Sequence, residues 1–299
     1  MRQLTFQVSQ EFDGTAVKSF LRNHCGLSAR LLVKLKRQPN GLTANGVLIR
    51  TIDILHSGDI ICITMPDDSK QLEPKSLPIH ISYEDEDVLV VDKPHDMPMY
   101  PSPGHDCDSL ANAVAAYFLN NKEKLAFRPV YRLDKDTSGL IIIAKNAYAA
   151  AKLATTVKKE YTAICEGILS GSGTIDFPIQ IKEGYGIQRE VGQNGIRAVT
   201  HWQAVSSGNH HTLLKLHLET GRTHQIRVHL SHIGHPLAGD DMYGGSRKLL
   251  DRQALHCSQV SFIHPVTAKQ ISLVCELPRD METLALACDF ANCTKHIVN

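Results

Sequence analysis

Two short segments, far apart in the chain, contain side chains suited to chemistry. Asp134 follows Tyr131-Arg132-Leu133 and precedes the turn-like run Asp136-Thr137-Ser138-Gly139, which opens into an apolar stretch at 140–144. A carboxylate at the start of a strand, among turn residues, can face a cleft while its backbone is held rigidly. Aspartate is also a frequent turn residue, and on local spacing alone a surface Asp that caps a turn is the favoured interpretation.

The second segment, ETGRTHQIRVH over 219–229, brings two arginines, two histidines and a glutamine close together. If 224–229 is helical, His224, Arg227 and Val228 share a face, because positions three and four apart are neighbours on a helix. Arg227 can then pair with a carboxylate in a cleft, and Arg222 with a phosphate.

Several histidines near this segment raise the question of a metal site. They are His217, His224, His229, His232 and His235. His232 and His235 are three positions apart, but no carboxylate stands at a matching position, and Asp240 and Asp241 follow too loosely to define a site. A catalytic zinc needs three protein ligands around an open fourth position. We therefore expect no metal; a zinc hydrolase is the alternative, which bound zinc would reveal.

Composition places the chain among ordinary globular proteins. It has 299 residues, 42% of them hydrophobic and 21% charged, which is enough for a sizeable core and for two domains. No apolar run approaches the ~20 residues that cross a bilayer, and the N-terminus lacks the apolar stretch of a secretory signal. We expect a cytoplasmic protein. The eight cysteines are scattered without a Cys-x-x-Cys pair, which favours free thiols over disulfides or zinc.

A cluster of cations near the N-terminus is the main electrostatic feature, since the net charge is only +1. No Asp or Glu interrupts it between residues 18 and 37. Such a cluster is expected of a phosphate-binding surface; a solvated helix face balanced by acids elsewhere is an equally good interpretation of the cluster alone. Its members are Lys18, Arg22, Arg30, Lys34, Lys36 and Arg37.

The elements around this cluster predict a small α/β domain over residues 1–65. Helices are expected over Thr15–Asn23 and after a Ser28 cap, followed by a turn at Asn45-Gly46 and a β-rich end at Gly58–Ile63. This order resembles the small RNA-binding module of a ribosomal small-subunit protein and of several RNA-modifying enzymes. The resemblance makes the cation cluster an expected RNA-binding face.

A polar stretch with three prolines, residues 66–78, predicts a linker. From 79 to 280 the chain has many short β-rich segments, interrupted by helices such as those expected over Ser109–Leu119 and Ala147–Thr155. Strands and helices do not alternate regularly, so we expect an α+β domain with a mixed, mostly antiparallel β-sheet and not a doubly wound parallel one. Residues 281–299 are expected to form a C-terminal helix or tail.

Five motifs occur in order between Asp92 and Pro265: DKP, YRLDKDTSGLIIIAKN, KKEYTAICEG, TGRTHQIRVHLSHIGHPLAGDDMYG and ALHCSQVSFIHP. Together they resemble the RluA family of RNA pseudouridine synthases, with the RNA-binding module in front as in its members directed at ribosomal RNA. The resemblance implies the pseudouridine synthase fold for the catalytic domain, and neither a metal nor an organic cofactor.

The resemblance also assigns roles to residues. Asp134 matches the catalytic aspartate, Tyr161 the active-site tyrosine, and Arg227 the arginine that pairs with the aspartate. The segment from Arg189 to Thr200 resembles a family loop that contacts RNA, and Arg222 is expected to bind RNA as well. Supporting positions in the active site are Arg132 and Thr137, which shape the aspartate loop, and Leu255, an apolar residue near the target base.

The implied reaction detaches uracil from ribose at a ring nitrogen, turns it over and rejoins it through a ring carbon, without net oxidation or hydrolysis. A carboxylate at the sugar either attacks the anomeric carbon or removes the proton beside it, and both roles stay open. A nearby arginine stabilises the carboxylate charge. Tyr161 is expected to pack against the base and to move a proton. Flipping a base out of its stack costs a few kcal/mol, which basic residues on the backbone offset.

Three features depart from the family pattern. Tyr131 stands where histidine is usual, His95-Asp96-Met97 replaces small residues, and the chain between Leu153 and Lys158 is short, which predicts a truncated helix before Tyr161. They leave substrate choice open. RNA is the expected partner, with large-subunit ribosomal RNA favoured over transfer RNA by analogy, and a monomer is expected. A catalytically silent RNA-binding or ribosome-assembly factor is the alternative function, and the intact Asp, Tyr and Arg set argues against it.

Overall fold

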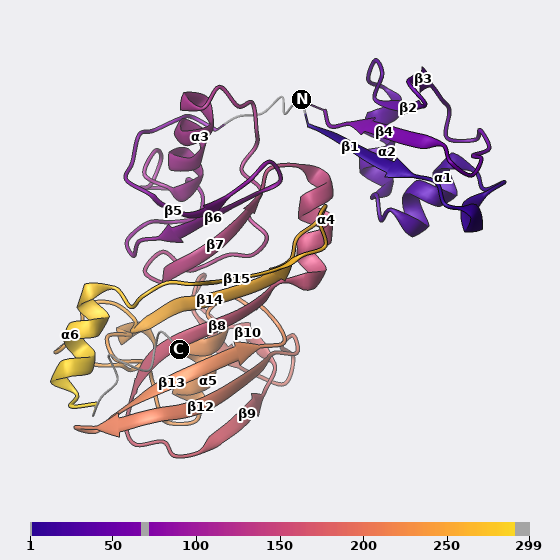
Figure 1. The fold of residues 1–299 in the computed structure, drawn as a ribbon. Coiled ribbons are helices and arrows are strands. Elements are labelled where there is room, and N and C mark those ends of the chain that lie inside the picture. Colours follow the sequence, from indigo (N-terminus) through magenta and orange to yellow (C-terminus); the bar gives the residue numbers. More distant parts are fainter. Residues whose placement is uncertain (1, 67–71, 291–299) are drawn as a thin grey trace.

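The structure is a computed structural model that describes residues 2–66 and 72–290. Figure 1 shows a small N-terminal unit beside a larger, elongated body. Part of the linker expected over 66–78 and the end of the tail expected over 281–299 lie outside the described residues.

The N-terminal unit contains a four-stranded antiparallel sheet in the order β1-β4-β2-β3. β2 and β3 form the hairpin expected at Asn45-Gly46, and both turn residues have positive φ, as this tight turn requires. β1 pairs along its whole length with the strand that closes the unit; the sequence interpretation did not anticipate this first strand. The strands are β1 (Gln3–Gln7), β2 (Leu42–Ala44), β3 (Val47–Leu48) and β4 (Ile60–Thr64).

The helices of this unit bury the apolar side chains that the sequence singled out. Val17, Phe20 and Leu21 are at most 1% exposed. The single helix expected over Thr15–Asn23 is instead a short α1 (Val17–Ser19) that continues into a π-helical turn, where Cys25 N donates to Phe20 O at 3.0 Å. In α2 (Ala29–Lys36), Ser28 Oγ accepts from Leu31 N at 3.1 Å, as the predicted cap requires. A 3₁₀ turn (Gln10–Phe12) precedes them.

The larger body is built on one nine-stranded sheet. β7 and β14 run parallel, and every other strand pair of this sheet within the described residues is antiparallel, so the predicted mixed, mostly antiparallel α+β class is confirmed. In sheet order the strands are β5 (His80–Glu84), β6 (Val88–Lys93), β7 (Ser138–Ala144), β14 (Leu255–Ile263), β8 (Lys158–Glu166), β13 (His211–Leu218), β12 (Val199–Gly208) and β9 (Ser172–Asp176), with β15 (Gln270–Val274) also on β14.

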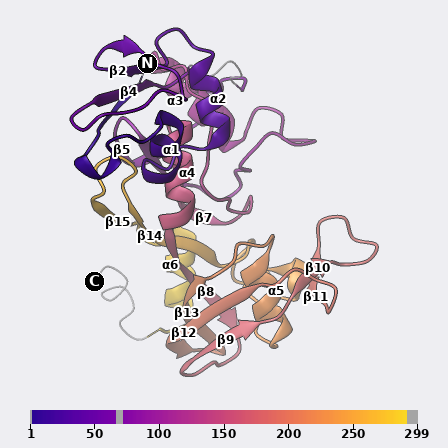
Figure 2. The ribbon, with the colours of Figure 1, turned by 90° about the vertical axis from the view of Figure 1, so that its right-hand side faces the viewer.

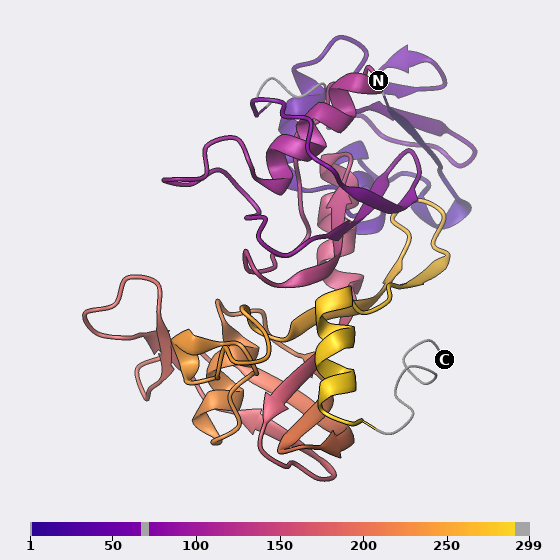
Figure 3. The same ribbon diagram turned by 90° about the vertical axis from the view of Figure 1, so that its left-hand side faces the viewer.

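Helices and one hairpin complete the body. The helices expected over Ser109–Leu119 and Ala147–Thr155 are present, and a single residue, Val157, separates α4 from β8. The hairpin of β10 (Ile179–Ile181) and β11 (Arg189–Val191) projects from the body (Figures 2 and 3). The helices are α3 (Leu110–Asn120), α4 (Ala147–Thr156), α5 (Gln225–His232), η3 (Asp241–Tyr243) and α6 (Arg279–Ala287).

Two contacts fasten the N-terminal unit to the larger body. Tyr148 of α4 packs into the apolar core of the N-terminal unit, and Figure 2 shows α4 beneath that unit. Arg2 donates twice to the buried Asp87, at 3.1 and 2.8 Å, and Asn146 donates to the same carboxylate at 2.8 Å. The main core lies around β6, β7, β8 and β14, and all seven residues of β7 are buried. This strand therefore gives the loop before it a rigid base.

The structure also bears on two expectations from composition. The cysteines of the described part form no disulfide, as expected of free thiols. Among residues 2–66 and 72–290, no helix combines the length and the apolar character that crossing a membrane requires.

Candidate active site

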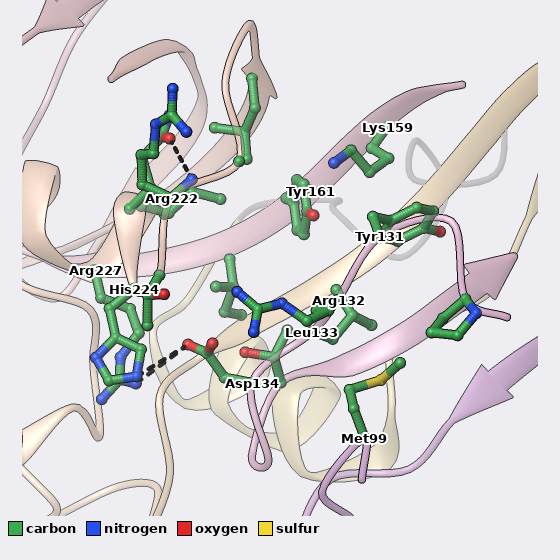
Figure 4. Close-up of a pocket in the computed structure, with 18 of the residues that line it drawn as sticks. Met99, Tyr131, Arg132, Leu133, Asp134, Lys159, Tyr161, Arg222, His224 and Arg227 are labelled. Atoms are coloured by element: carbon green, nitrogen blue, oxygen red, sulfur yellow. Dashed lines mark hydrogen bonds and ion pairs between the residues drawn. The ribbon is translucent and has the colours of Figure 1, made fainter. Parts of the chain in front are cut away.

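Asp134 lies in a loop at the edge of a cavity of about 590 Å³. The loop ends where β7 begins, and Thr137 N closes its turn by donating to Asp134 O at 3.1 Å. Tyr161 from β8 and Arg227 from α5 line the same cavity (Figure 4). The structure thus brings together three residues that the sequence separates by as many as 93 positions.

Arg227 stands between two carboxylates. Its Nη1 donates to Asp134 Oδ2 at 3.2 Å, while Nε and Nη2 donate to the two oxygens of Asp240 at 2.7 and 2.8 Å. The Asp240 contact is the stronger one, because it is bidentate and both side chains are almost fully buried. Burial alone would lower the pKa of Arg227, but the hydrogen bonds and charges of Asp240 and Asp134 more than offset it and raise that pKa. The guanidinium is therefore a permanent positive charge beside Asp134.

Lys93, whose side chain is fully buried, holds the Asp134 loop in place through hydrogen bonds to backbone carbonyls. Its Nζ donates to Pro94 O at 2.8 Å, and to Met97 O and Lys135 O at 2.9 Å each. Burial lowers the pKa of Lys93 to about 7. Because Lys135 is adjacent to Asp134, the ammonium fixes the position of the carboxylate through the backbone.

Arg252, which is paired with the C-terminal helix, also holds the loop in place. Arg252 Nη1 donates to Asp136 O at 3.0 Å, and Asp280 of α6 accepts from Arg252 at 2.6 and 2.9 Å. Gln253 Nε2 donates to Thr137 Oγ1 at 3.2 Å. Thr137 thus contacts both Gln253 and the backbone of Asp134, while α6, to which the sequence assigned no role, orients the arginine that bonds the loop.

The apolar wall of the cavity is built from β8 and β14. Tyr161 and Leu255 are each 4% exposed and line the cavity together. Burial raises the pKa of Tyr161 well above its usual range, so its phenol stays protonated. Tyr131, the departure from the family pattern, also lines the cavity; its hydroxyl donates to Leu140 O at 2.7 Å, and Lys159 Nζ lies 4.6 Å from its ring centre. Burial lowers the pKa of Lys159.

Two exposed arginines stand at the mouth of the cavity. Arg132 extends into it (Figure 4), and its guanidinium has no hydrogen-bond or ion-pair partner within residues 2–66 and 72–290. Arg222 also lines the cavity, and its Nε donates to Arg197 O at 3.1 Å. Both are accessible to an anionic ligand.

The helical interpretation of 224–229 needs correction. α5 begins at Gln225, and His224 precedes it in the left-handed region with φ of 56°. The reason is Gln225, whose buried amide bonds Thr220 Oγ1, Arg222 N and Val199 O at 2.8 to 3.0 Å and so fixes the first turn. Val228 packs in an apolar cluster that includes Tyr243 and does not line the cavity, whereas Arg227 does. His224 nevertheless reaches the cavity, 3.9 Å from Asp134 Oδ2.

The sequence interpretation missed Asp240 and Tyr243 as site residues. Both lie in the motif HPLAGDDMYG, which carries the resemblance but contains no periodicity that reveals a contact. The available signal was simple: Arg227 needs a carboxylate partner, and Asp240 is the first acidic residue after α5 in the sequence. Lys159, two positions before Tyr161, was likewise missed, although the alternation of a strand puts both residues on one face.

The predicted RNA-binding cations of the N-terminal unit are all exposed. Lys18 and Arg22 line a hollow of about 480 Å³ on their own unit. Lys34 instead faces a cavity of about 470 Å³ between the unit and the larger body, with Lys122 and Lys124 on the opposite wall. The remaining three predicted cations, which line neither cavity, are Arg30, Lys36 and Arg37.

Arg189 is the first residue of β11, directly after the loop of the projecting β10–β11 hairpin. Its Nη1 donates to three carbonyls of its own loop, those of Gly186, Ile187 and Gln188, at 3.1 to 3.3 Å. Its backbone N donates to Tyr243 Oη at 2.9 Å. The side chain therefore shapes the hairpin loop, and the backbone ties the hairpin to Tyr243, which in turn contacts the cavity-lining His224.

The five histidines considered for a metal site do not converge. Within the described residues, the one group of three suitable side chains is Asp85, Asp87 and His264. His264 Nδ1 accepts from the backbone N of Val266 and Thr267 at 3.3 and 3.0 Å, so the ring proton is on Nε2. Nε2 lies 2.9 Å from Asp85 Oδ2 but off the hydrogen-bonding direction. A protonated ring nitrogen cannot bind a metal, so this group is an electrostatic contact between histidine and carboxylate.

Comparisons with known proteins agree with this geometry. Residues 87–232 match the family model described as RNA pseudouridylate synthase. The uncharacterized RNA pseudouridine synthase YjbO of Bacillus subtilis is 38% identical over 267 residues, which cover 87% of this chain and 94% of that protein. Ribosomal large subunit pseudouridine synthase D of Xylella fastidiosa is 36% identical, with 81% of this chain and 80% of that protein covered.

A solved structure gives the same answer for the fold. Human RNA pseudouridylate synthase domain containing 1 superposes with a TM-score of 0.55 at 28% identity, covering 69% of this chain and 87% of that one. Fold and site thus define an RNA-modifying isomerase. The chain belongs to the RNA pseudouridine synthase family, as its motifs predicted.

Proposed function

We propose that this enzyme converts uridines of large-subunit ribosomal RNA into pseudouridine, with Asp134 acting at the ribose. The observation that carries the proposal is the contact of Asp134 Oδ2 with the buried Arg227, at 3.2 Å, inside an open cavity. Oδ2 has its donor, whereas Oδ1 has no hydrogen-bond partner in the described part of the chain. Oδ1 is therefore the oxygen available to the substrate, as a nucleophile or as a base.

The cavity wall suits an uncharged pyrimidine. Tyr161 and Leu255 offer an apolar surface against which a flipped base can lie. Because its pKa is raised by burial, Tyr161 acts as a phenol that donates or relays a proton, not as a standing base. Arg132 and Arg222 at the cavity mouth are placed to bind the phosphates that flank the base.

Ribosomal RNA is favoured as substrate for two reasons. Curated relatives that are 35–36% identical are ribosomal large subunit pseudouridine synthases. The chain also carries an N-terminal unit with exposed cations, which we propose binds RNA, over residues 1–65 and ahead of a catalytic domain over 79–280. A monomeric, cytoplasmic enzyme is the simplest arrangement consistent with this assignment.

The test is pseudouridine mapping on large-subunit ribosomal RNA from cells that carry only an Asp134→Asn variant. We expect one or more sites to lose pseudouridine completely, while the purified variant binds RNA with affinity within a fewfold of the wild type, because the substitution keeps the shape of the side chain and removes its charge. Asp136→Asn is the matched control, since Asp136 contacts Arg252 through its backbone oxygen.

The alternative, a catalytically silent assembly factor, makes the opposite prediction. Cells with Asp134→Asn would then keep every pseudouridine, whereas loss of the whole protein would disturb ribosome assembly. Transfer RNA mapped in the same cells separates the two substrate classes, because a site lost there and not in ribosomal RNA would overturn the substrate assignment.

A further inference from the structure

A chain of two hydrogen bonds runs from the projecting hairpin to His224, which lies beside Asp134. Arg189 N donates to Tyr243 Oη at 2.9 Å, and Tyr243 Oη lies 2.8 Å from His224 Nδ1. The other ring nitrogen of His224, Nε2, is 3.9 Å from Asp134 Oδ2. Figure 4 shows His224 beside Arg227, with both side chains turned toward the carboxylate.

The contacts of Tyr243 bear on the tautomer of His224. Tyr243 Oη already accepts from the backbone of Arg189, and His224 Nδ1 is the one other polar atom that it bonds within the described residues. A phenol oxygen accepts up to two hydrogen bonds and donates one; in the arrangement in which Tyr243 uses its proton within the protein, it donates to Nδ1, which is then unprotonated. A neutral imidazole with a bare Nδ1 has its proton on Nε2, facing Asp134.

The surroundings keep this imidazole neutral. Its side chain is 13% exposed, and burial lowers the pKa of His224; Asp134 and Asp240 act against that change, and Arg227 and Arg189 act with it. A second positive charge beside Arg227 is therefore disfavoured. The Nε2–H dipole remains as a neutral donor directed at the oxygen that Arg227 holds.

We propose that His224 is a positioning residue for the isomerisation, a neutral donor that Tyr243 locks in the Nε2–H form and that holds Asp134 Oδ2 so that Oδ1 stays free for the ribose. The inference rests on the proposed role of Asp134. His224 lines the cavity from its left-handed position just before α5 begins. The distance of 3.9 Å shortens to a hydrogen bond when the substrate fills the cavity.

The first test reads the tautomer directly in the free enzyme. In protein labelled with ¹⁵N-histidine, a long-range ¹H–¹⁵N spectrum distinguishes protonated from unprotonated ring nitrogens, and the signals that disappear in His224→Gln belong to His224. We expect an unprotonated Nδ1 and a protonated Nε2, and a shift toward the Nδ1–H form in Tyr243→Phe. A protonated Nδ1 in the wild type would overturn the proposal. This readout needs no turnover, so it stands even if the proposed substrate is wrong.

The second test separates a donor from a merely structural residue. In His224→Gln the amide nitrogen reaches the place of Nε2, whereas in His224→Asn the amide stops near Nδ1. Asparagine tolerates the left-handed backbone better than glutamine. A structural role therefore favours the Asn variant, and the proposed donor favours the Gln variant. We expect kcat within about threefold of wild type for Gln and at least tenfold lower for Asn, with KM for RNA unchanged in both; the reverse order of kcat contradicts the proposal.

Discussion

At the scale of single residues, Arg227 shares one charge between two carboxylates, those of Asp240 and Asp134. Asp240 takes two of its N–H groups and Asp134 takes one. The bidentate contact with Asp240 holds the guanidinium plane in place. Arg227 therefore bonds one oxygen of Asp134 and leaves the other unblocked. Asp240 thereby determines how strongly Arg227 interacts with the carboxylate of Asp134.

The consequence can be tested with Asp240→Asn. We expect a loss of roughly 3–5 kcal/mol in the free energy of unfolding, because one partner of a buried ion pair is removed, and a fall in kcat of at least tenfold as Arg227 shifts toward Asp134. Urea unfolding and a single-turnover assay measure the two effects. Asp241→Asn is the matched control, because Asp241 is exposed and pairs at 3.2 Å with an exposed Arg247. Equal behaviour of the two variants would rule out this role of Asp240.

Because of Lys93, we expect activity to fall and stability to rise as the pH increases above 7. Above its pKa of about 7 the ammonium becomes an amine with two N–H groups for three carbonyls. The Asp134 loop then loses a donor, so kcat should decline as the pH rises from 7 to 9. Because this folded-state pKa lies below the ordinary value, burying the charged lysine costs stability below pH 7, and the cost is relieved as the pH rises toward about 10.4.

The measurement is the difference in unfolding free energy between the wild type and Lys93→Met as a function of pH. We expect it to rise by up to about 1.4 kcal/mol per pH unit between pH 7 and 10. Lys135→Met is the control: the pKa of Lys135 is raised by its hydrogen bond to Asp96, so no such rise belongs to it in this window. A flat difference for Lys93→Met would contradict a lowered pKa.

At the scale of elements, the parallel contact between β7 and β14 places the Asp134 loop beside Leu255. Gly139 makes this contact possible: its φ is +113°, and an added Cβ would lie 2.4 Å from Cys257 O. We expect Gly139→Ala to cost roughly 2–5 kcal/mol, as strain and overpacking combine, and to lower activity. Gly186→Ala, where nothing lies within 4 Å, is the control. Urea denaturation midpoints of both variants provide the measurement; unchanged stability for Gly139→Ala contradicts the close approach.

Elements with a strong local signal were predictable from the sequence. β7 is a continuous apolar run, and Ser28 and Ser109 precede α2 and α3 as caps. β1 was not predictable, because its partner β4 lies more than fifty residues later and only their pairing stabilises so short a strand.

The site was predictable in part, for a related reason. Asp134, Tyr161 and Arg227 came from motif resemblance, whereas spacing alone left Asp134 a turn residue. The left-handed His224 follows from contacts of Gln225 with β12, and the Asp240 contact crosses a loop. Such tertiary polar contacts leave no periodic pattern, so local spacing placed the start of α5 wrongly and passed over Asp240.

At the scale of the whole molecule, the N-terminal unit is held at a defined place by α4 and by the Arg2–Asp87 pair. This docking creates the second cavity, where Lys34 of the N-terminal unit faces Lys122 and Lys124 of the larger body. The segment after Lys124 runs through Pro129 and Tyr131 into the wall of the active-site cavity. Lysines of both units therefore line this cavity, together with Glu86 and Glu123, and the segment that follows leads toward the cavity of Asp134. Such lysines are suited to contact RNA phosphates.

The three lysines of this cavity predict how salt affects RNA binding. Replacing Lys34, Lys122 and Lys124 together by Gln removes up to three phosphate contacts, so the slope of log K against log salt should decrease by about 2 to 3, at roughly 0.7–0.9 per contact. Affinity at low salt should fall while kcat on saturating RNA stays within a fewfold, because none of the three lysines lines the active-site cavity.

The matched control replaces three exposed lysines that line none of the three cavities, Lys75, Lys158 and Lys269, and so removes the same net charge. Long-range attraction alone makes both triple variants lose affinity equally, because the whole-molecule charge changes by the same amount. If these lysines contact phosphates directly, the slope of log K against log salt decreases only in the variant that lacks Lys34, Lys122 and Lys124. Filter binding of a ribosomal RNA fragment across 50–300 mM salt separates the two cases, and equal slopes would show that RNA does not enter the cavity between the two units.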